Sequence, residues 1–377
     1  MIDIKSLTTD WLATKRNKYS KDPGLMESMV YALYLLEQLK LTGLDFVFKG
    51  GTSLILLMDQ PKRFSVDIDV IISPLIKRED LENYLSQIIG TSVFKRMELD
   101  EKRSYKVGIS KAHYKFIFIS GFAIRNKDGN VISNPEREIL LDIHFIENQY
   151  PTLVNTPIKT EWLIQKGEPV SVKTPDINSI AGDKLTAFAP NTTGILYGTE
   201  KQKEIVKQLF DVGCLFDLLT DLEVFKKSFL DCVKNEISFR PERKIVSAEQ
   251  VLNDIIETAI LIAKRDALKL DEDKSKFAEI STGINQFGHF VYVGKFGMME
   301  AQVASSKAAY LAAIILTDFK GNLVRFSPAI PLNEYLITQT EYNFLNKRLK
   351  FVAQGEALFY WFQTINMLFP KSGLSEK

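Results

Sequence analysis

The chain has 377 residues, of which 45% are hydrophobic and 25% are charged, and its formal net charge is +1. These values exclude a disordered or fibrous chain and are typical of a globular protein of about two domains. The near-zero net charge excludes an overall basic field, so any nucleic-acid site must come from local basic clusters.

Three features predict a cytoplasmic protein with no membrane partner. The only cysteines, Cys214 and Cys232, are too few for a disulfide framework. The sequence opens with M-I-D-I-K-S-L-T-T-D and shows no basic-then-apolar leader. Its longest apolar-rich run, residues 308–316, is far shorter than the about 20 residues that span a bilayer.

The first elements are expected to be a loosely packed polar segment and an amphipathic helix. Residues 1–22 are polar, whereas apolar residues recur at three- and four-residue spacing over residues 23–41. Pro23 suits the first turn of this helix and Gly43 suits its end.

A strand, a Gly-Gly turn, a helix and a second strand are predicted next. The strand covers residues 44–48, and the helix after the turn runs to about residue 58. Lys49 is expected to be solvated at the end of the first strand. The second strand begins near Arg63 and carries Asp67 and Asp69.

Asp67 and Asp69 are candidate metal ligands. Alternate residues of a strand point to one face, so Asp67 and Asp69 share a face and Ile68 takes the other. Two carboxylates on one face of a buried strand repel each other, and a divalent cation removes that cost. The Asp-x-Asp pattern also occurs on surface strands and in the metal sites of glycosyltransferases.

The Gly-Gly turn before the helix is a candidate phosphate site. Gly50 and Gly51 allow the backbone to approach a ligand closely, and the helix that Thr52 and Ser53 open offers free N–H groups to an anion. Arg63 is placed to offer a fork of donors to phosphate. Together with the aspartates, the turn predicts a site for a nucleoside triphosphate with magnesium.

The middle of the chain alternates between helix and strand patterns. We expect a helix over residues 79–89, strands over residues 103–109 and 113–120, and a turn at residues 126–130.

A further strand is predicted over residues 139–146, where Asp142 and His144 interrupt the sequence I-L-L-D-I-H-F-I. A carboxylate within so apolar a strand needs a reason, and we expect Asp142 to face the same site as Asp67 and Asp69. His144 is expected to be a hydrogen-bonded structural residue.

The second half of the chain is expected to be mostly helical. Residues 159–172 are the candidate linker or flap, which divides the chain into domains 1–172 and 173–377. Helical patterns cover residues 179–188, 203–219, 248–268, 298–317 and 342–368. On pattern alone, Lys184 and Asp211 are charges on exposed helix faces.

Five motifs in this order resemble one protein family: F-K-G-G-T-S-L, R-F-S-V-D-I-D, L-L-D-I, G-D-K-L-T-A-F and K-Q-L-F-D-V. The chain resembles, over residues 26–219, the AbiEii/AbiGii-type nucleotidyltransferase toxins of abortive-infection and toxin–antitoxin systems. This family belongs to the DNA-polymerase-β-like nucleotidyltransferase superfamily. The resemblance implies an α/β (α+β) catalytic core with a mixed sheet and a mostly α-helical C-terminal domain.

The resemblance also implies roles for residues near the Gly-Gly turn. Asp67 and Asp69 would hold magnesium, and Gly50, Gly51, Thr52 and Ser53 would hold the triphosphate. Asp142 would be a third carboxylate, acting as a metal ligand or as the base.

Two residues of the second domain match a lysine and an aspartate that occur later in the sequences of the family. Lys184 and Asp211 would belong to the active site, so the helical domain would contribute them to the cleft. Lys184 would supply a point charge to the phosphates.

Partners, too, follow from the resemblance. It implies transfer of a nucleoside monophosphate from a nucleoside triphosphate to RNA such as a tRNA 3′ end. The result of this transfer would be growth arrest or aborted phage infection. The resemblance also implies a cognate antitoxin as a partner. Transfer to a protein or a small molecule, and a non-catalytic RNA- or partner-binding protein on the same fold, stay open as alternatives.

Overall fold

The computed structural model describes residues 1–106, 108, 110–125, 130–244 and 247–370. The predicted turn at 126–130 lies outside these residues except for residue 130. Contacts within the chain define two compact units. The sheet unit comprises Met1–Asp176 and Phe290–Gly294, and the helical unit comprises Ile177–His289 and Lys295–Lys377.

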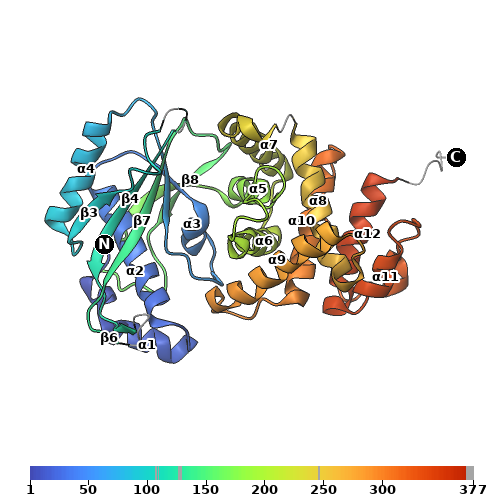
Figure 1. Ribbon diagram of the computed structural model, residues 1–377, viewed down its shortest axis with the longest axis horizontal. Helices are drawn as coiled ribbons and strands as arrows, with labels where there is room; N and C mark the ends of the chain where they lie inside the picture. Colours follow the sequence, from blue (N-terminus) through green and yellow to red (C-terminus); the bar gives the residue numbers. More distant parts are fainter. Residues whose placement is uncertain (107, 109, 126–129, 245–246, 371–377) are drawn as a thin grey trace. The chain divides into compact units, whose positions relative to one another are not determined.

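In the described residues, a seven-stranded mixed sheet forms the centre of the sheet unit, in the order β3-β4-β7-β2-β1-β9-β8 (Figure 1). Its strands are β1 (Val47–Lys49), β2 (Ile68–Ile72), β3 (Arg96–Leu99), β4 (Lys111–Ile119), β7 (Glu136–Phe145), β8 (Leu153–Pro157) and β9 (Ser171–Pro175). The pairs β2–β7 and β1–β9 are parallel, and the other neighbours are antiparallel. The predicted mixed sheet is therefore confirmed.

One face of this sheet is apolar and buried, and the other carries the polar residues. Along β7, Ile139, Leu141 and Ile143 are buried, whereas the residues between them are partly exposed. This alternation is what a strand with one covered face requires. The buried face belongs to the same core as the helices α2 (Pro23–Leu41) and α4 (Arg78–Thr91), both of which were predicted.

The N-terminal segment is anchored to the sheet unit, contrary to the predicted loose packing. It forms the 3-10 helix η1 (Ile4–Leu7) and the helix α1 (Thr9–Tyr19). The indole N–H of Trp11 donates to the backbone oxygen of Trp162 at 2.8 Å, and Trp162 is fully buried. Residues 159–172 lie within the sheet unit, where they follow β8 and include the first two residues of β9.

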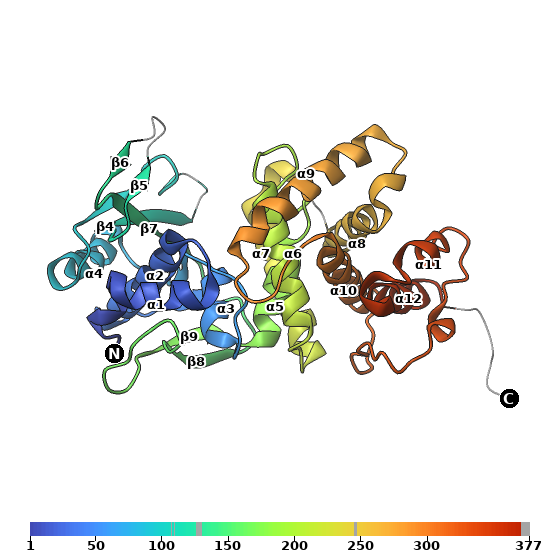
Figure 2. The same ribbon diagram turned by 90° about the horizontal axis from the view of Figure 1, so that it is seen from below.

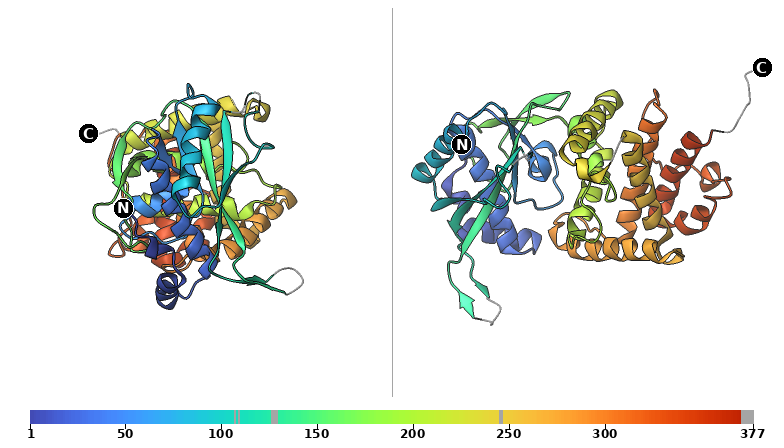
Figure 3. Two further views of the ribbon diagram at one scale, coloured as in Figure 1. Left: turned by 90° about the vertical axis from the view of Figure 1, so that its left-hand side faces the viewer. Right: turned by 45° about the horizontal axis from the view of Figure 1, so that its top comes forward.

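Two strand predictions differ from the structure. Strand β2 begins at Ile68, later than predicted, because Arg63 instead forms an isolated bridge with Val291. The described part of residues 103–109 forms turns and bends, and the strand that pairs with β4 is β3, earlier in the chain. A short ribbon of β5 (Ile124–Arg125) and β6 (Val131–Ile132) extends from the sheet unit (Figure 3).

The described part of the helical unit contains no strand, as its mostly helical sequence pattern predicts (Figure 2). Its helices are α5 (Ile177–Ala187), α6 (Gln202–Phe216), α7 (Leu222–Phe239), α8 (Ala248–Lys264), α9 (Asp271–Phe287), α10 (Met298–Leu316), α11 (Phe344–Leu349) and α12 (Glu356–Leu368). Short 3-10 helices are η2 (Pro241–Arg243), η3 (Arg265–Ala267), η5 (Leu332–Tyr335) and η6 (Val352–Gly355), and η4 (Gly288–Phe290) lies where the chain returns to the sheet unit.

The helices α7 and α9 were not predicted, although α7 carries a clear start signal. The side chain of Asp221 accepts hydrogen bonds from the backbone N–H groups of Glu223 and Val224, which satisfies two free donors of the first turn. Within the described residues, each helix is too short or too polar to cross a bilayer.

Candidate functional site

Four charged or titratable residues form one row across the polar face of the sheet. The strand register pairs Lys49 of β1 with Asp69 of β2, Asp69 with Asp142 of β7, and Asp142 with His113 of β4. Register partners on neighbouring strands point to the same face. The row therefore brings together Asp69 and Asp142, which lie 73 positions apart in the sequence.

His113, like Lys49, was not predicted to be part of the site. Its ring Nδ1 forms a hydrogen bond with Oδ1 of Asp142, and both side chains are largely buried. Its backbone N–H donates to Oγ of Ser104 at 2.9 Å. Only the pairing of β4 with β7 places it here, and that pairing leaves no local signal in the sequence.

Lys49 is buried, contrary to the predicted solvated strand end. As the last residue of β1 it lies in the interior of the sheet, with Asp69 as its register partner. A lysine in this position lowers the electrostatic cost of the neighbouring carboxylates.

Gly50 starts the helix α3 (Gly50–Leu57) directly against Asp69. Its backbone is left-handed, with φ of +77°, and a Cβ atom at this position would lie 2.7 Å from Cγ and 2.9 Å from Cβ of Asp69. Glycine is therefore required both for the backbone conformation and for the space that Asp69 occupies.

The second glycine of the turn makes room for Arg63. A Cβ atom on Gly51 would overlap the Arg63 guanidinium and would lie 3.0 Å from Oγ of Ser65. The guanidinium is buried, and its Nη1 donates to the backbone oxygen of Phe64 at 2.9 Å. The structure thus brings the predicted phosphate ligands Gly51 and Arg63 into contact range of each other.

The hydroxyl groups of Thr52 and Ser53 hold the turn together. Thr52 Oγ1 donates to the backbone oxygen of Asp67 at 2.5 Å, and Ser53 Oγ donates to that of Gly50 at 2.8 Å. Both side chains are buried. The start of α3 has no side-chain cap, so what this turn offers to an anion is backbone N–H.

The three predicted carboxylate ligands differ in their positions relative to the paired strands. Asp69 and Asp142 are register partners, whereas Asp67 lies one residue before β2. Among the described residues, no three His, Cys, Asp or Glu side chains come close enough together to hold a metal ion. The arrangement is therefore a pair of neighbouring carboxylates, and the metal role of Asp67 stays a prediction.

Lys184 and Asp211 form a buried ion pair within the helical unit. Nζ of Lys184, on α5, lies 3.2 Å from Oδ2 of Asp211, on α6, and the side chains are 7% and 1% exposed. Lys184 also donates to Oε1 of Gln208 at 3.2 Å. Both residues were predicted to be exposed on pattern alone, and only the family resemblance grouped them.

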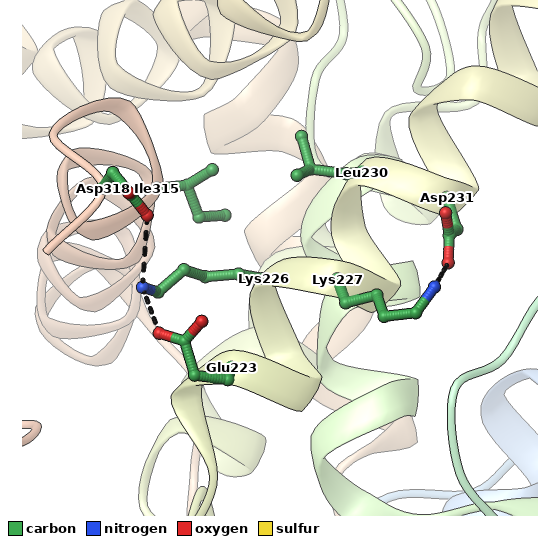
Figure 4. Close-up of a pocket in the computed structure, with 7 residues that line it drawn as sticks. All are labelled: Glu223, Lys226, Lys227, Leu230, Asp231, Ile315 and Asp318. Atoms are coloured by element: carbon green, nitrogen blue, oxygen red, sulfur yellow. Dashed lines mark hydrogen bonds and ion pairs between the residues drawn. The ribbon is translucent and has the colours of Figure 1, made fainter. Parts of the chain in front are cut away.

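A surface pocket of about 250 Å³ in the helical unit contains none of the predicted site residues (Figure 4). Lys226 pairs there with Glu223 at 2.6 Å and with Asp318 at 3.7 Å, and Lys227 pairs with Asp231 at 2.7 Å. Because its charged groups are already paired with one another, this pocket offers little binding energy to a charged ligand.

The sequence was compared with known families and the structure with solved structures. A family model described as "Nucleotidyl transferase AbiEii toxin, Type IV TA system" matches residues 34–286, which is more than half of the chain. The comparison with curated proteins gave no match.

One solved structure with a similar chain is that of an antigenic nucleotidyltransferase-like protein from Paracoccidioides brasiliensis. It is 15% identical, with a TM-score of 0.34, and the match covers 58% of this chain and 90% of that one.

Removing one partner of the Lys184–Asp211 pair should destabilise the protein more than removing both charges. We expect Lys184→Met or Asp211→Asn alone to lower the free energy of unfolding by about 3–5 kcal/mol, because each leaves a buried charge unpaired. The double variant should lose much less than the sum. Urea unfolding followed by circular dichroism measures all four proteins, and additive losses would contradict a coupled pair.

Gly50→Ala should lower the free energy of unfolding more than Gly43→Ala, which is the matched control. Both glycines have positive φ, but a Cβ on Gly43 meets no atom within 4 Å. We expect Gly43→Ala to cost about 1–2 kcal/mol, the strain of a left-handed backbone. Gly50→Ala should cost more, because Asp69 must also move. Equal losses in urea unfolding would show that Asp69 does not restrict this position.

Proposed function

The chain belongs to the AbiEii family of nucleotidyltransferase toxins of type IV toxin–antitoxin systems, and we propose that it transfers a nucleoside monophosphate from a nucleoside triphosphate to RNA. The observation that carries the proposal is the register that pairs Asp69 with Asp142 on one face of the sheet, next to the Gly50–Gly51 turn.

Two carboxylates in this arrangement are suited to a divalent cation. Magnesium is commonly bound through one or two carboxylates together with the phosphates of the substrate, so Asp69 and Asp142 fit its donor chemistry without a third ligand. When bound, the ion would neutralise phosphate oxygens and align attack with departure. Asp67 is the proposed additional ligand.

The Gly50–Gly51 turn is the proposed binding site of the triphosphate. Its free backbone N–H groups at the start of α3 and the Arg63 guanidinium beside Gly51 supply donors for phosphate oxygens. Lys184 as a further cation for the phosphates is a proposal that rests on the family resemblance alone; within the helical unit its ammonium group forms an ion pair with Asp211.

In the proposed reaction, a hydroxyl oxygen of the acceptor attacks the α-phosphorus. A new phosphorus–oxygen bond forms, the bond to the pyrophosphate oxygen breaks, and pyrophosphate leaves. Asp142 takes the proton of the hydroxyl, or would help hold a cation that, when bound, lowers the pKa of that hydroxyl. His113 fixes the orientation of Asp142 by its hydrogen bond to Oδ1.

RNA is proposed as the acceptor because the family resemblance implies it, with a tRNA 3′ end as the specific target. As a member of a type IV system, the chain is expected to have a cognate antitoxin.

Transfer of label tests this proposal. The purified protein is incubated with magnesium, each labelled nucleoside triphosphate in turn, and total RNA or cell lysate. We expect label in RNA, and a loss of at least about 100-fold in the Asp69→Asn/Asp142→Asn variant or after chelation, because several kcal/mol of charge stabilisation are removed.

Asp80→Asn is the control, because Asp80 is exposed on α4. It should transfer label at the wild-type rate. Label in protein or in small molecules would refute RNA as the acceptor, and absence of label from every acceptor would favour a non-catalytic binding protein.

A further inference from the structure

Phe351 is an aromatic side chain that folding leaves in water. It is 80% exposed and lies between α11 and α12, where the sequence predicts an unbroken helix. Nζ of Lys350 lies 4.6 Å from the centroid of its ring. An exposed phenylalanine contributes little to the stability of the fold. Its ring is therefore available to a ligand, with Lys350 beside it.

Two segments of the helical unit meet at α11, and we call them the basic cap: residues 264–267 and residues 344–351, the second of which ends at Phe351. Nη1 of Arg348 lies 2.9 Å from Oδ1 of Asp266, and Nζ of Lys264 lies 5.7 Å from the ring centroid of Phe344. Figures 1 and 2 show α8 and α11 next to each other at this point.

The basic cap carries a concentrated positive charge, which a net negative charge on the rest of the chain nearly balances. It contains five basic residues and one acidic residue, a net charge of 5 − 1 = +4, whereas the whole chain has a net charge of +1. Asp266 pairs with Arg348. The other four cations have no ion-pair partner within 4.0 Å in the described ranges: Lys264, Arg265, Lys347 and Lys350.

The backbone of the basic cap and the turn that follows it is strained. Arg265 has φ of +49°, and Ala353, Gln354 and Gly355 have φ of +47°, +59° and +95° in succession. A left-handed non-glycine residue costs about 1–3 kcal/mol and persists where the surroundings enforce it, often at binding sites. The chain here keeps a costly conformation that breaks the helix and presents Phe351.

We propose that the basic cap binds single-stranded RNA. Proteins that bind single strands combine cations for the phosphates with exposed aromatic rings on which bases stack. Lys264, Arg265, Lys347 and Lys350 supply the cations, and Phe351 supplies the ring. The inference rests on the proposed function only for the choice of RNA as the ligand.

A protein partner fits this surface less well. Cores of protein–protein interfaces are depleted in lysine and other charged residues, whereas here the exposed ring lies beside Lys350 on a cap with a net charge of +4. A polyanion with bases matches both features of the basic cap, its charge and its exposed ring.

Binding is measured by fluorescence anisotropy without nucleoside triphosphate or magnesium, so the result does not depend on catalysis. The probe is a fluorescein-labelled 12-nucleotide single-stranded RNA of mixed sequence, and the full-length protein is used. We expect Phe351→Ala to weaken binding about tenfold, and Phe351→Trp to retain it, because stacking needs a ring of either kind.

The cations are tested by salt dependence. Lys347→Ser/Lys350→Ser should lower the slope of log K against log salt by about 1.4, since each phosphate contact to a single strand contributes about 0.7. Leu75→Ala is the control for Phe351, because Leu75 is an exposed apolar residue of the sheet unit. Lys95→Ser/Lys102→Ser is the control for charge, because both lysines are exposed. Neither control should change binding.

Three results would overturn the inference. The first is RNA binding at wild-type affinity by both Phe351→Ala and the double lysine variant. The second is tighter binding of duplex RNA than of single-stranded RNA. The third is loss of antitoxin binding by Phe351→Ala while its RNA binding stays intact. A failed transfer of label with cap-dependent RNA binding intact would instead refute the catalytic proposal alone. Thermal unfolding of each variant confirms that it is folded.

Discussion

The parallel pairing of β2 with β7 is the constraint on which the candidate site depends. It sets Asp69 beside Asp142 on strands about 4.8 Å apart, where two carboxylates repel each other. A shift of β2 by one residue would bury Asp69 and expose Ile68 and Val70 of the covered face. The buried face therefore fixes the register, and the register places the charges. Lys49 and His113, at the two ends of the row, reduce the electrostatic cost of placing the two carboxylates side by side.

Most features with a local sequence signal were predicted, with the helix α7 as an exception, whereas the strand neighbours of Lys49 and His113 were not. The helices α2 and α3 and the strand β7 follow from apolar periodicity and glycine positions within each segment. Asp142 stood out because a carboxylate is unusual in an apolar strand. The burial of Lys49 and the place of His113 depend on which strands are neighbours, and periodicity within one strand does not contain that information.

Two features of the helical unit also could not be predicted from local sequence patterns. Its Lys184–Asp211 pair joins two helices, and only the family motifs grouped these residues, since each alone resembles a solvated helix-face charge. The break between α11 and α12 depends on successive left-handed residues, two of which are not glycine. Such residues have little intrinsic preference for that conformation, so the apolar pattern of residues 342–368 predicts one continuous helix.

The central claim is that Asp69 and Asp142 act as one cation-binding pair. Isothermal titration of Mn²⁺ in the presence of a non-hydrolysable nucleoside triphosphate tests it directly, with wild type, Asp69→Asn, Asp142→Asn and the double variant. The account predicts that each single variant weakens Mn²⁺ binding at least about tenfold and that the double variant loses little more, because the two carboxylates act as a unit. Wild-type affinity in either single variant would contradict it.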